Sequence, residues 1–302
     1  MIYEDPYLLK SCIVAENRKN RPAVDELVHT CPFCPGHESD IEKVWLEVKQ
    51  ENNFLIKIVN NKYPICGYNH ELYGVHDVVI DTPRHLQLPK DFSNSHWTIL
   101  LDTMQKRWMQ IAQDPKIEFI QIFKNSGKNA GASIRHSHWQ IVALSQIPYQ
   151  MAQQYSHYNR FYDQMQNCYI CHKLEEIDKS DIILENDKWI AIAPTSSEFA
   201  HETWLVPKLH RKHYGELEPQ ELEKAGALLK TLLTAYEHLK ENVSFNICFM
   251  SGGLHNALDY HFYIKIIPRL THWAGFELAT HCYINTIHPK THVQLMRSIL
   301  KE

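Results

Sequence analysis

The sequence has no uninterrupted apolar run near the roughly 18 residues that a membrane-spanning helix requires. Its first residues, MIYEDPYLLK, have neither the basic start nor the apolar stretch of a secretory signal peptide. An excess of basic residues is also missing, because 31 Lys and Arg stand against 35 Asp and Glu, for a formal net charge of -4. These absences argue against a membrane protein, a secreted protein and a nucleic-acid binder. We therefore expect a cytoplasmic protein.

Histidine and cysteine are the residue types that stand out. The chain of 302 residues has 20 histidines and 8 cysteines, and 44% of its residues are hydrophobic, enough for a substantial core. This length corresponds to roughly two domains of ordinary size. Four cysteines form two C-x-x-C pairs, Cys31/Cys34 and Cys168/Cys171. Because a reducing cytoplasm disfavours disulfides, the pairs indicate metal binding or redox chemistry.

The chain repeats one pattern of cysteines and histidines. A C-x-x-C pair is followed by a strand-like stretch that ends in a proline and a histidine, and then by a histidine that opens an apolar stretch. The members are Cys31, Cys34, His85 and His136 in the first half, and Cys168, Cys171, His210 and His261 in the second half. The two histidines are 51 residues apart in both halves. Agreement in order, context and spacing together indicates an internal repeat.

Hydrophobic periodicity predicts the same element order in each half: strand, strand, helix, strand, strand. Strands are expected at 54–59, 75–81, 117–123 and 136–144, and again at 189–193, 203–206, 243–250 and 261–267. Helices are expected at 95–113 and 219–240, with a linking helix at 148–166 and a last one at 290–300. This order predicts an α+β fold of two tandem halves, residues 1–150 and 151–302, each an antiparallel sheet with helices on one side.

Each half supplies the ligands for one zinc ion. A structural zinc site takes four nitrogen or sulfur ligands in a tetrahedron, and a mixed Cys and His set favours zinc over magnesium or calcium. A C-x-x-C turn provides two thiolates, which two histidines from distant strands can complete. A redox pair is the alternative, but the prolines of Cys31-Pro-Phe-Cys34-Pro suit a tight knuckle better than a helix start. His96 and His201 are reserve ligands for His85 and His210.

The segment from His136 to Gln140, His-Ser-His-Trp-Gln, carries the proposed chemistry. Successive side chains of a strand alternate between its faces, so His136, His138 and Gln140 are expected on one face. A neutral imidazole held in one tautomer can attack phosphorus, which makes His138 a candidate nucleophile. The alternatives are that His138 is an ordinary strand histidine or a third metal ligand.

Small residues precede this segment. Asn125-Ser-Gly127 and Gly131-Ala-Ser133 lie directly upstream, and glycine lets a backbone approach a phosphate closely. The Ser133 hydroxyl and the Gln140 amide can donate hydrogen bonds to phosphoryl oxygens. Such a loop is weak evidence alone, but it leads straight into the histidine pair.

From about Cys31 to about Asn285 the chain resembles the galactose-1-phosphate uridylyltransferase family, a branch of the histidine-triad superfamily. The His136-Ser-His138-Trp-Gln140 segment carries the resemblance most specifically. The resemblance implies that His138 becomes nucleotidylated and that Gln140 stabilises the phosphoryl group. It also implies that His136 is a zinc ligand, with Cys31, Cys34 and His85 completing its site.

Other segments of the family match this chain as well. Asn125, Gly131 and Ser133 correspond to the family's phosphate-contacting loop, and the segment that begins at Asn61 resembles the one that holds the nucleoside. Gly275-Phe276-Glu277 resembles the segment that reaches the partner sugar, so Phe276 and Glu277 are candidate substrate contacts. Tyr283 replaces a glutamine of galactose-specific members. This region and the second C-x-x-C pair look more like the ADP-glucose phosphorylase branch.

The sequence therefore predicts a nucleotidyl transferase that moves NMP from a nucleoside diphosphate sugar to a sugar 1-phosphate through nucleotidyl-His138, with one or two structural zinc ions. One alternative is an ADP-glucose or dinucleoside polyphosphate phosphorylase, for which inorganic phosphate is the acceptor. Another is a non-catalytic nucleotide-binding regulatory protein, against which the intact His138 and Gln140 argue. The second half has Phe262 and Tyr263 after His261, and we interpret it as a degenerate copy. The family also suggests a homodimer.

Overall fold

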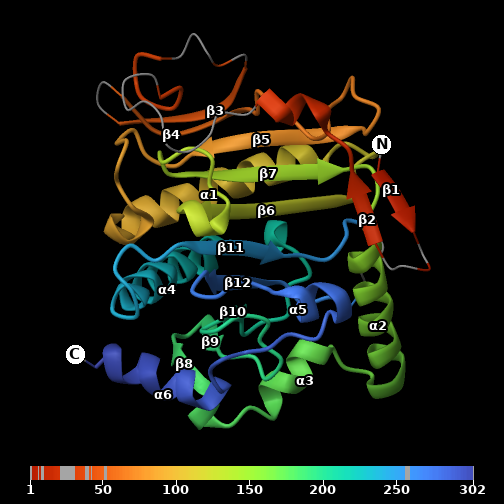
Figure 1. The fold of residues 1–302 in the computed structure, drawn as a ribbon, viewed down its shortest axis with the longest axis vertical. Coiled ribbons are helices and arrows are strands. Elements are labelled where there is room, and N and C mark those ends of the chain that lie inside the picture. Colours follow the sequence, from red (N-terminus) through yellow and green to blue (C-terminus); the bar gives the residue numbers. More distant parts are fainter. Residues whose placement is uncertain are drawn as a thin grey trace.

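The computed structural model describes residues 2–5, 7, 10–20, 31–37, 41, 43–50, 53–255 and 259–301. Within these residues, ten strands form one continuous sheet in the order β3-β4-β5-β7-β6-β11-β12-β10-β9-β8, and every neighbouring pair is antiparallel. In Figure 1 the sheet runs from β3 at the top to β8 at the bottom. The strands are β3 (Val44–Gln50), β4 (Asn53–Asn60), β5 (Gly74–Ile80), β6 (Phe119–Ser126), β7 (His138–Leu144), β8 (Ile182–Glu185), β9 (Trp189–Ile192), β10 (Thr203–Pro207), β11 (Phe245–Met250) and β12 (Tyr263–Pro268). A separate hairpin joins β1 (Ile2–Asp5) and β2 (Lys10–Ile13).

The two halves of the sheet have the same strand order. From the outer edge inward, the first half reads β3-β4-β5-β7-β6 and the second half reads β8-β9-β10-β12-β11. The halves meet where β6 pairs with β11, so the equivalent strand of each copy lies at the centre. Pairing these two strands removes two edges whose backbone groups would otherwise be exposed. The α+β fold and the repeat are confirmed, and the single sheet is a feature that the sequence did not predict.

Two long helices lie side by side on one face of the sheet (Figure 1). Helix α1 (Asn94–Ala112) begins after Ser93, whose hydroxyl accepts a hydrogen bond from the His96 N–H, and α4 (Pro219–Glu237) begins with proline. Both bury their apolar stripes in one core shared by the two halves. Burying each large apolar side chain stabilises the fold by roughly 1.5–3 kcal/mol, so this shared core joins the halves strongly.

Shorter helices complete the structure. Helix α2 (Tyr149–Met165) and helix α3 (Tyr169–Glu175) contribute Tyr155, Tyr158 and Ile170 to a second core on the opposite face. The expectation of helices on one side of each sheet thus holds for α1 and α4, whereas α2 and α3 cover the opposite face. Helix α6 (Pro289–Ile299) packs against β8, and α5 (Gly275–Thr280) follows β12.

The predicted elements occur within a few residues of their expected ends, with two systematic differences. The edge strand of each half was not predicted, β3 in the first half and β8 in the second. Strands β7 and β12 begin at His138 and Tyr263, two residues later than predicted. His136 has no strand partner because β5 ends at Ile80, which pairs with His138, and the chain then leaves the sheet.

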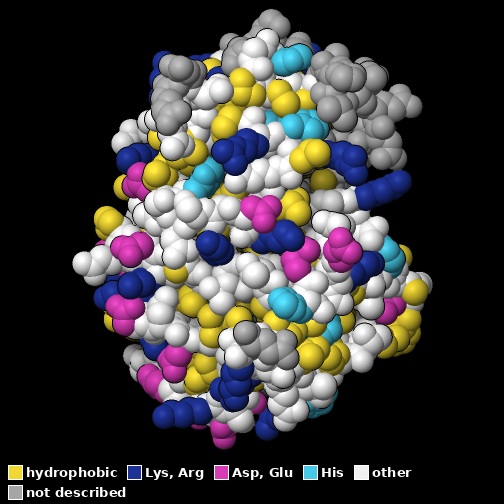
Figure 2. Space-filling model, turned by 90° about the vertical axis from the view of Figure 1, so that its left-hand side faces the viewer, with side chains coloured by type: hydrophobic (Ala, Val, Ile, Leu, Met, Phe, Trp, Pro, Cys, Tyr) yellow, Lys and Arg dark blue, Asp and Glu magenta, His cyan; other side chains and the backbone are white. Residues whose placement is uncertain are grey.

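The face in Figure 2 carries basic and acidic side chains interspersed with apolar ones. Such a mosaic gives this face no field of one sign, so its electrostatics depend on local pairs. Among the described residues, no helix is both long enough and apolar enough to cross a membrane.

Candidate active site

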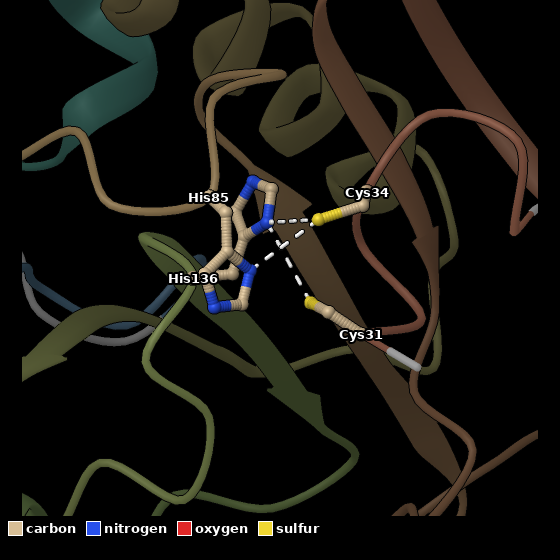
Figure 3. A group of neighbouring side chains, drawn as sticks. All are labelled: Cys31, Cys34, His85 and His136. Atoms are coloured by element: carbon tan, nitrogen blue, oxygen red, sulfur yellow. Dashed lines mark hydrogen bonds between the residues drawn. The ribbon is translucent and has the colours of Figure 1, made fainter. Parts of the chain in front are cut away.

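The four side chains of the first repeat unit converge on one point (Figure 3). The ligand atoms of Cys31, Cys34, His85 and His136 all lie within 4.8 Å of one another. Cys34 Sγ is 3.3 Å from His85 Nδ1 and 3.5 Å from His136 Nδ1. Burial, with the neighbouring Cys31, raises the pKa of the Cys34 thiol to about 11, so a bound cation would be needed to hold both thiolates. The cluster could hold a metal ion.

Cys168, Cys171, His210 and His261 form an equivalent cluster in the second half, again within 4.8 Å. The correspondence extends beyond the ligands. His136 Nε2 lies 2.7 Å from the Thr82 carbonyl, and His261 Nε2 lies 3.0 Å from the Pro207 carbonyl. A ring that donates from Nε2 presents Nδ1 to the cluster, as metal-binding histidines commonly do. Within the described residues no other such cluster occurs.

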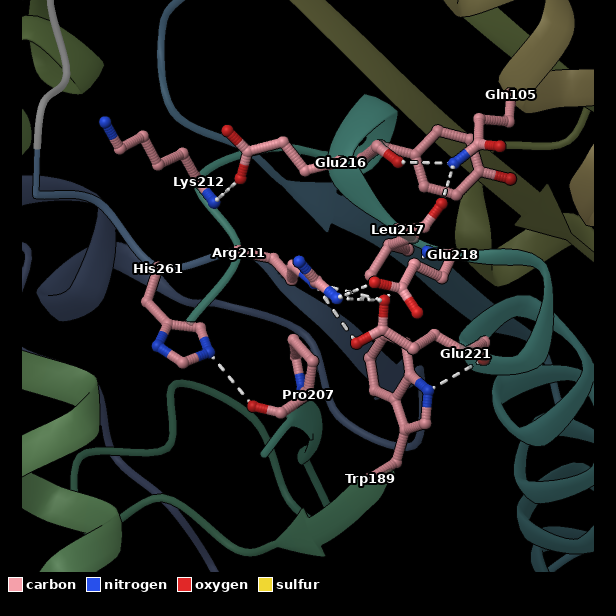
Figure 4. Close-up of polar contacts among 11 residues, drawn as sticks. Gln105, Trp189, Pro207, Arg211, Lys212, Glu216, Leu217, Glu218, Glu221 and His261 are labelled. Carbon is pink, nitrogen blue, oxygen red and sulfur yellow. Dashed lines mark hydrogen bonds and ion pairs between the residues drawn. The ribbon is translucent and has the colours of Figure 1, made fainter. Parts of the chain in front are cut away.

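Hydrogen bonds connect the segment that follows His210 to both long helices, α1 and α4 (Figure 4). Arg211 Nε bonds both carboxylate oxygens of Glu221 at 3.1 and 3.0 Å, at the start of α4. From α1, Gln105 Nε2 donates to the carbonyls of Tyr214 and Leu217. These bonds hold the second cluster to the junction of the halves.

The two reserve ligands have other roles. His96 Nε2 bonds the Asp81 carbonyl at 2.6 Å, and burial lowers the pKa of His96. His201 Nδ1 lies 2.9 Å from His292 Nδ1. Neither belongs to a cluster, so the structure brings together the histidines that the repeat selected, His85 with His136 and His210 with His261.

His138 is the first residue of β7, and its side chain is buried. Its Nδ1 lies 2.9 Å from the His136 carbonyl oxygen. A carbonyl only accepts, so Nδ1 carries the ring proton and Nε2 carries the lone pair. His138 lies outside both Cys and His clusters. The backbone that precedes β7 thus selects the tautomer in which Nε2 can act as a nucleophile.

A cavity of about 240 Å³ opens beside His138. Among the candidate residues, His138, Gln140, Ser133 and Asn61 line it together. Its other walls are Pro32, Phe33, Ile41, Val59, Asn60, Lys62, Tyr63, Val78 and Ile134. The cavity therefore combines apolar walls with a few polar groups, as small-molecule sites usually do.

His76 contacts two polar groups of this cavity, and no motif in the sequence marked it as a site residue. Its Nδ1 accepts the Ile65 N–H at 3.1 Å, so Nε2 carries the proton. That nitrogen lies 2.9 Å from Gln140 Oε1 and 2.9 Å from Asn61 Nδ2. Of these two atoms only Gln140 Oε1 can accept, so the proton on His76 Nε2 points to it. The NH2 group of Gln140 then remains available as a donor.

The buried side chain of Lys124 holds the start of β7 by hydrogen bonds. It is 1% exposed, and its Nζ bonds Asp81 Oδ2 at 2.8 Å, Ser137 Oγ at 2.8 Å and the His138 carbonyl at 3.0 Å. Burial lowers the pKa of Lys124, while the Asp81 carboxylate opposes that shift. The ammonium group thus fixes the backbone of the candidate nucleophile.

The loop between β6 and β7 needs its glycines. Gly127 and Gly131 have φ values of +82° and +80°, in the region that favours glycine. A Cβ on Gly127 would also lie 2.3 Å from Ser244 Oγ in the second half. This loop begins after Ser126, the last residue of β6, and leads to Ser133.

Phe276 and Glu277 do not line this cavity within one chain, and neither do Asn125 and Gly131. Phe276 is exposed in α5, and the Glu277 carboxylate accepts the Ala274 N–H at 3.0 Å, which caps that helix. Their predicted role as sugar contacts stays a prediction.

The chain matches two family models. Residues 89–302 match "Domain of unknown function (DUF4921)", and residues 14–147 match "Domain of unknown function (DUF4931) N-terminal domain". ADP-glucose phosphorylase of Arabidopsis thaliana is 30% identical over 290 residues, which cover 89% of this chain and 82% of that protein. Galactose-1-phosphate uridylyltransferase of Thermotoga maritima is 24% identical over 94% of both chains.

This chain belongs to the galactose-1-phosphate uridylyltransferase-like family. The crystal structure of the Arabidopsis ADP-glucose phosphorylase with bound ADP-glucose has a TM-score of 0.82 at 29% identity and covers 98% of each chain. A uridylyltransferase mutant has a TM-score of 0.87 at 21% identity and shows the same fold. Membership in the uridylyltransferase-like family confirms the resemblance and identifies an enzyme of the nucleotidyltransferase type.

Proposed function

We propose that this enzyme transfers a nucleoside monophosphate from a nucleoside diphosphate sugar to a phosphate acceptor through a covalent bond to His138. The tautomer of His138 carries the proposal, because the 2.9 Å contact between its Nδ1 and the His136 carbonyl leaves the lone pair on Nε2. In the first step this lone pair attacks the α-phosphorus. The bond from phosphorus to the bridging oxygen breaks, and sugar 1-phosphate leaves with the electron pair.

The second step reverses the first with another acceptor. An oxygen of the acceptor phosphate attacks the same phosphorus, and the phosphorus–nitrogen bond breaks to restore His138. The NH2 group of Gln140 and the hydroxyl of Ser133 would stabilise the charge on the phosphoryl oxygens. Asn61 would hold the nucleoside and Asn125 and Gly131 the phosphates, as the family resemblance suggests.

Two acceptors deserve testing. Sugar 1-phosphate is the acceptor expected of a uridylyltransferase. Inorganic phosphate is favoured by the similarity to ADP-glucose phosphorylase along most of the chain, and by the resemblance of Ala274–Asn285 to that branch. Supplying either acceptor to a loaded enzyme and identifying the released product would separate the two.

The first experiment is intact-protein mass spectrometry after mixing the enzyme with UDP-glucose or ADP-glucose without acceptor. A gain of UMP or AMP mass that is absent in His138→Ala would support the covalent mechanism and identify the base. If neither donor modified the wild type, the proposed reaction with these donors would be wrong and the regulatory alternative would gain support.

We also propose that zinc occupies both clusters, because two thiolates and two imidazoles form a set that zinc prefers. The metal would supply rigidity to the loops that carry its ligands, which include His136 beside the nucleophile. The catalytic half would be residues 1–150, with residues 151–302 as its degenerate copy.

A homodimer would explain why Phe276 and Glu277 lie away from the cavity of their own chain. In such a dimer, α5 of one protomer would complete the cavity of the other. Mixing His138→Ala with Phe276→Ala should then restore activity, because each mixed dimer has one site with both residues intact. Recovery no greater than the sum of the separate variants would contradict this arrangement.

A further inference from the structure

The strand pair that joins the two halves places two asparagines directly opposite each other. Asn125 of β6 pairs with Asn246 of β11. Asn246 Nδ2 donates to Asn125 Oδ1 at 2.8 Å and to the Ala130 carbonyl at 2.9 Å. The Asn246 side chain therefore connects the C-terminal half to the loop that leads to Ser133.

The orientation of the Asn246 amide follows from the chemistry of its partners. On one side, Arg269 Nη1 lies 3.3 Å from Asn246 Oδ1, and a guanidinium group can only donate. On the other side, the Ala130 carbonyl can only accept. Arg269 is itself held by its main-chain N–H, which bonds the Ser244 carbonyl at 2.7 Å, and by the Phe199 ring, 4.7 Å from its guanidinium carbon. Asn246 must therefore present its NH2 group to Asn125.

This orientation determines the polarity of Asn125. Its Oδ1 accepts the hydrogen bond from Asn246, so its own NH2 group is the part left to donate elsewhere. Phe123 pairs with Gln140 across β6 and β7, and Asn125 lies two residues further along β6. Alternation places Asn125 on the same face of the sheet as Gln140. A reversed amide would present its oxygen on that face and repel an anionic phosphate.

We propose that Asn246 is a positioning residue for nucleotidyl transfer, which holds the Asn125 NH2 group toward the substrate phosphates and fixes the loop at Ala130. The proposal rests on the proposed function, in which Asn125 contacts those phosphates. It gives the C-terminal half a direct part in the chemistry of the N-terminal half, because hydrogen bonds connect Arg269 to Asn246 and Asn246 to Asn125.

Asn246→Asp is the sharpest variant, because a carboxylate of the same shape can accept from Arg269 but cannot donate to Asn125 or Ala130. We expect the rate of nucleotidyl-enzyme formation, followed by rapid-quench mass spectrometry, to fall about 10- to 100-fold, as for a lost hydrogen bond to a charged group. Asn246→Ala should also lower the rate of nucleotidyl-enzyme formation. Cys248→Ala, two residues along the same face of β11, is the matched control and should react at the wild-type rate.

A double-mutant cycle separates positioning from a structural role. If Asn246 acts through Asn125, adding Asn246→Ala to Asn125→Ala should slow the reaction by less than about 3-fold further, because the two losses are not independent. The urea midpoints of both Asn246 variants should stay near that of Cys248→Ala. Additive losses, or Asn246 variants that react at the wild-type rate, would overturn the proposal.

A binding measurement keeps the two proposals distinguishable. The affinities for ADP and UDP, measured by isothermal titration, need no turnover and should fall about 10-fold in Asn246→Asp but not in Cys248→Ala. If the wild type forms no nucleotidyl adduct but Asn246→Asp still binds ADP and UDP more weakly than Cys248→Ala, the proposed function is contradicted and the positioning role is supported. Equal nucleotide affinity and equal adduct rates would contradict the positioning role alone.

Discussion

The ring of Phe33 packs edge-on against the ring of His138, with 5.2 Å between the centroids and 61° between the planes. Phe33 lies between Cys31 and Cys34, so the turn that supplies two cysteines of the first cluster also supplies a wall of the cavity. The same ring lies 6.1 Å from that of His136. The first Cys and His cluster and the candidate nucleophile are therefore in contact through one aromatic side chain.

Phe33→Ala should slow nucleotidyl-enzyme formation while leaving the metal content unchanged. An aromatic pair contributes about 0.5–1.5 kcal/mol beyond the area that it buries, which corresponds to a loss of several-fold in rate. Phe33→Leu keeps much of the apolar wall and should lose less. Metal analysis of both variants is the control, and loss of metal in Phe33→Ala would show that the ring supports the cluster instead.

Each cluster should bind one metal ion independently. We expect two zinc ions per chain by elemental analysis of the wild type, and one in either Cys31→Ser or Cys168→Ser. Cys31→Ser should also lower stability, because metal binding contributes to folding. His138→Ala is the control and should retain both ions. Full metal content in Cys31→Ser would disprove the assignment of the first cluster.

Lys124→Met should destabilise the protein by about 3–5 kcal/mol in urea unfolding, because it leaves the buried Asp81 carboxylate without its cation. Lys124→Met combined with Asp81→Asn should recover part of this loss, since no buried charge then remains. Lys106→Met, at an exposed ion pair with Asp102, should change stability by less than about 1 kcal/mol. Equal effects of the two lysine variants would contradict the importance of the buried pair.

The stability of the C-terminal half should fall as the pH is lowered. Burial, helped by the neighbouring His201, lowers the pKa of His292 from 6.5 to about 3. Above pH 6.5 both states are neutral at this residue, but below it the unfolded chain binds a proton that the folded chain does not. Stability is therefore lost progressively from about pH 6.5 toward pH 3.

His292→Gln should weaken this pH dependence in urea unfolding, because glutamine can still form hydrogen bonds but does not titrate. His157→Gln, at an exposed position of α2, is the matched control and should leave the dependence unchanged. The same slope in the wild type and in His292→Gln would disprove the role of His292.

Local sequence was sufficient for several parts of the fold and site. The stripe from Trp97 to Ile111 predicted α1 and its buried face, because helical periodicity is a property of neighbouring residues. The members of both Cys and His clusters could be predicted from the repeat, since the second half shows the same spacing as the first. The order His136-x-His138-x-Gln140 was likewise sufficient to select the strand that lines the cavity.

Tertiary structure decided which residues assist that strand. His76 is 64 residues from Gln140, and Asn246 is 121 residues from Asn125, so their contacts depend on strand register. No local pattern encodes register between distant strands, because it results from packing the whole sheet against its helices. The sequence by itself determined which cysteines and histidines cluster, the candidate nucleophile and the long helices of this protein. Only the folded chain could determine how His76, Phe33 and Asn246 orient them, since a hydrogen bond requires atoms within about 3 Å of each other.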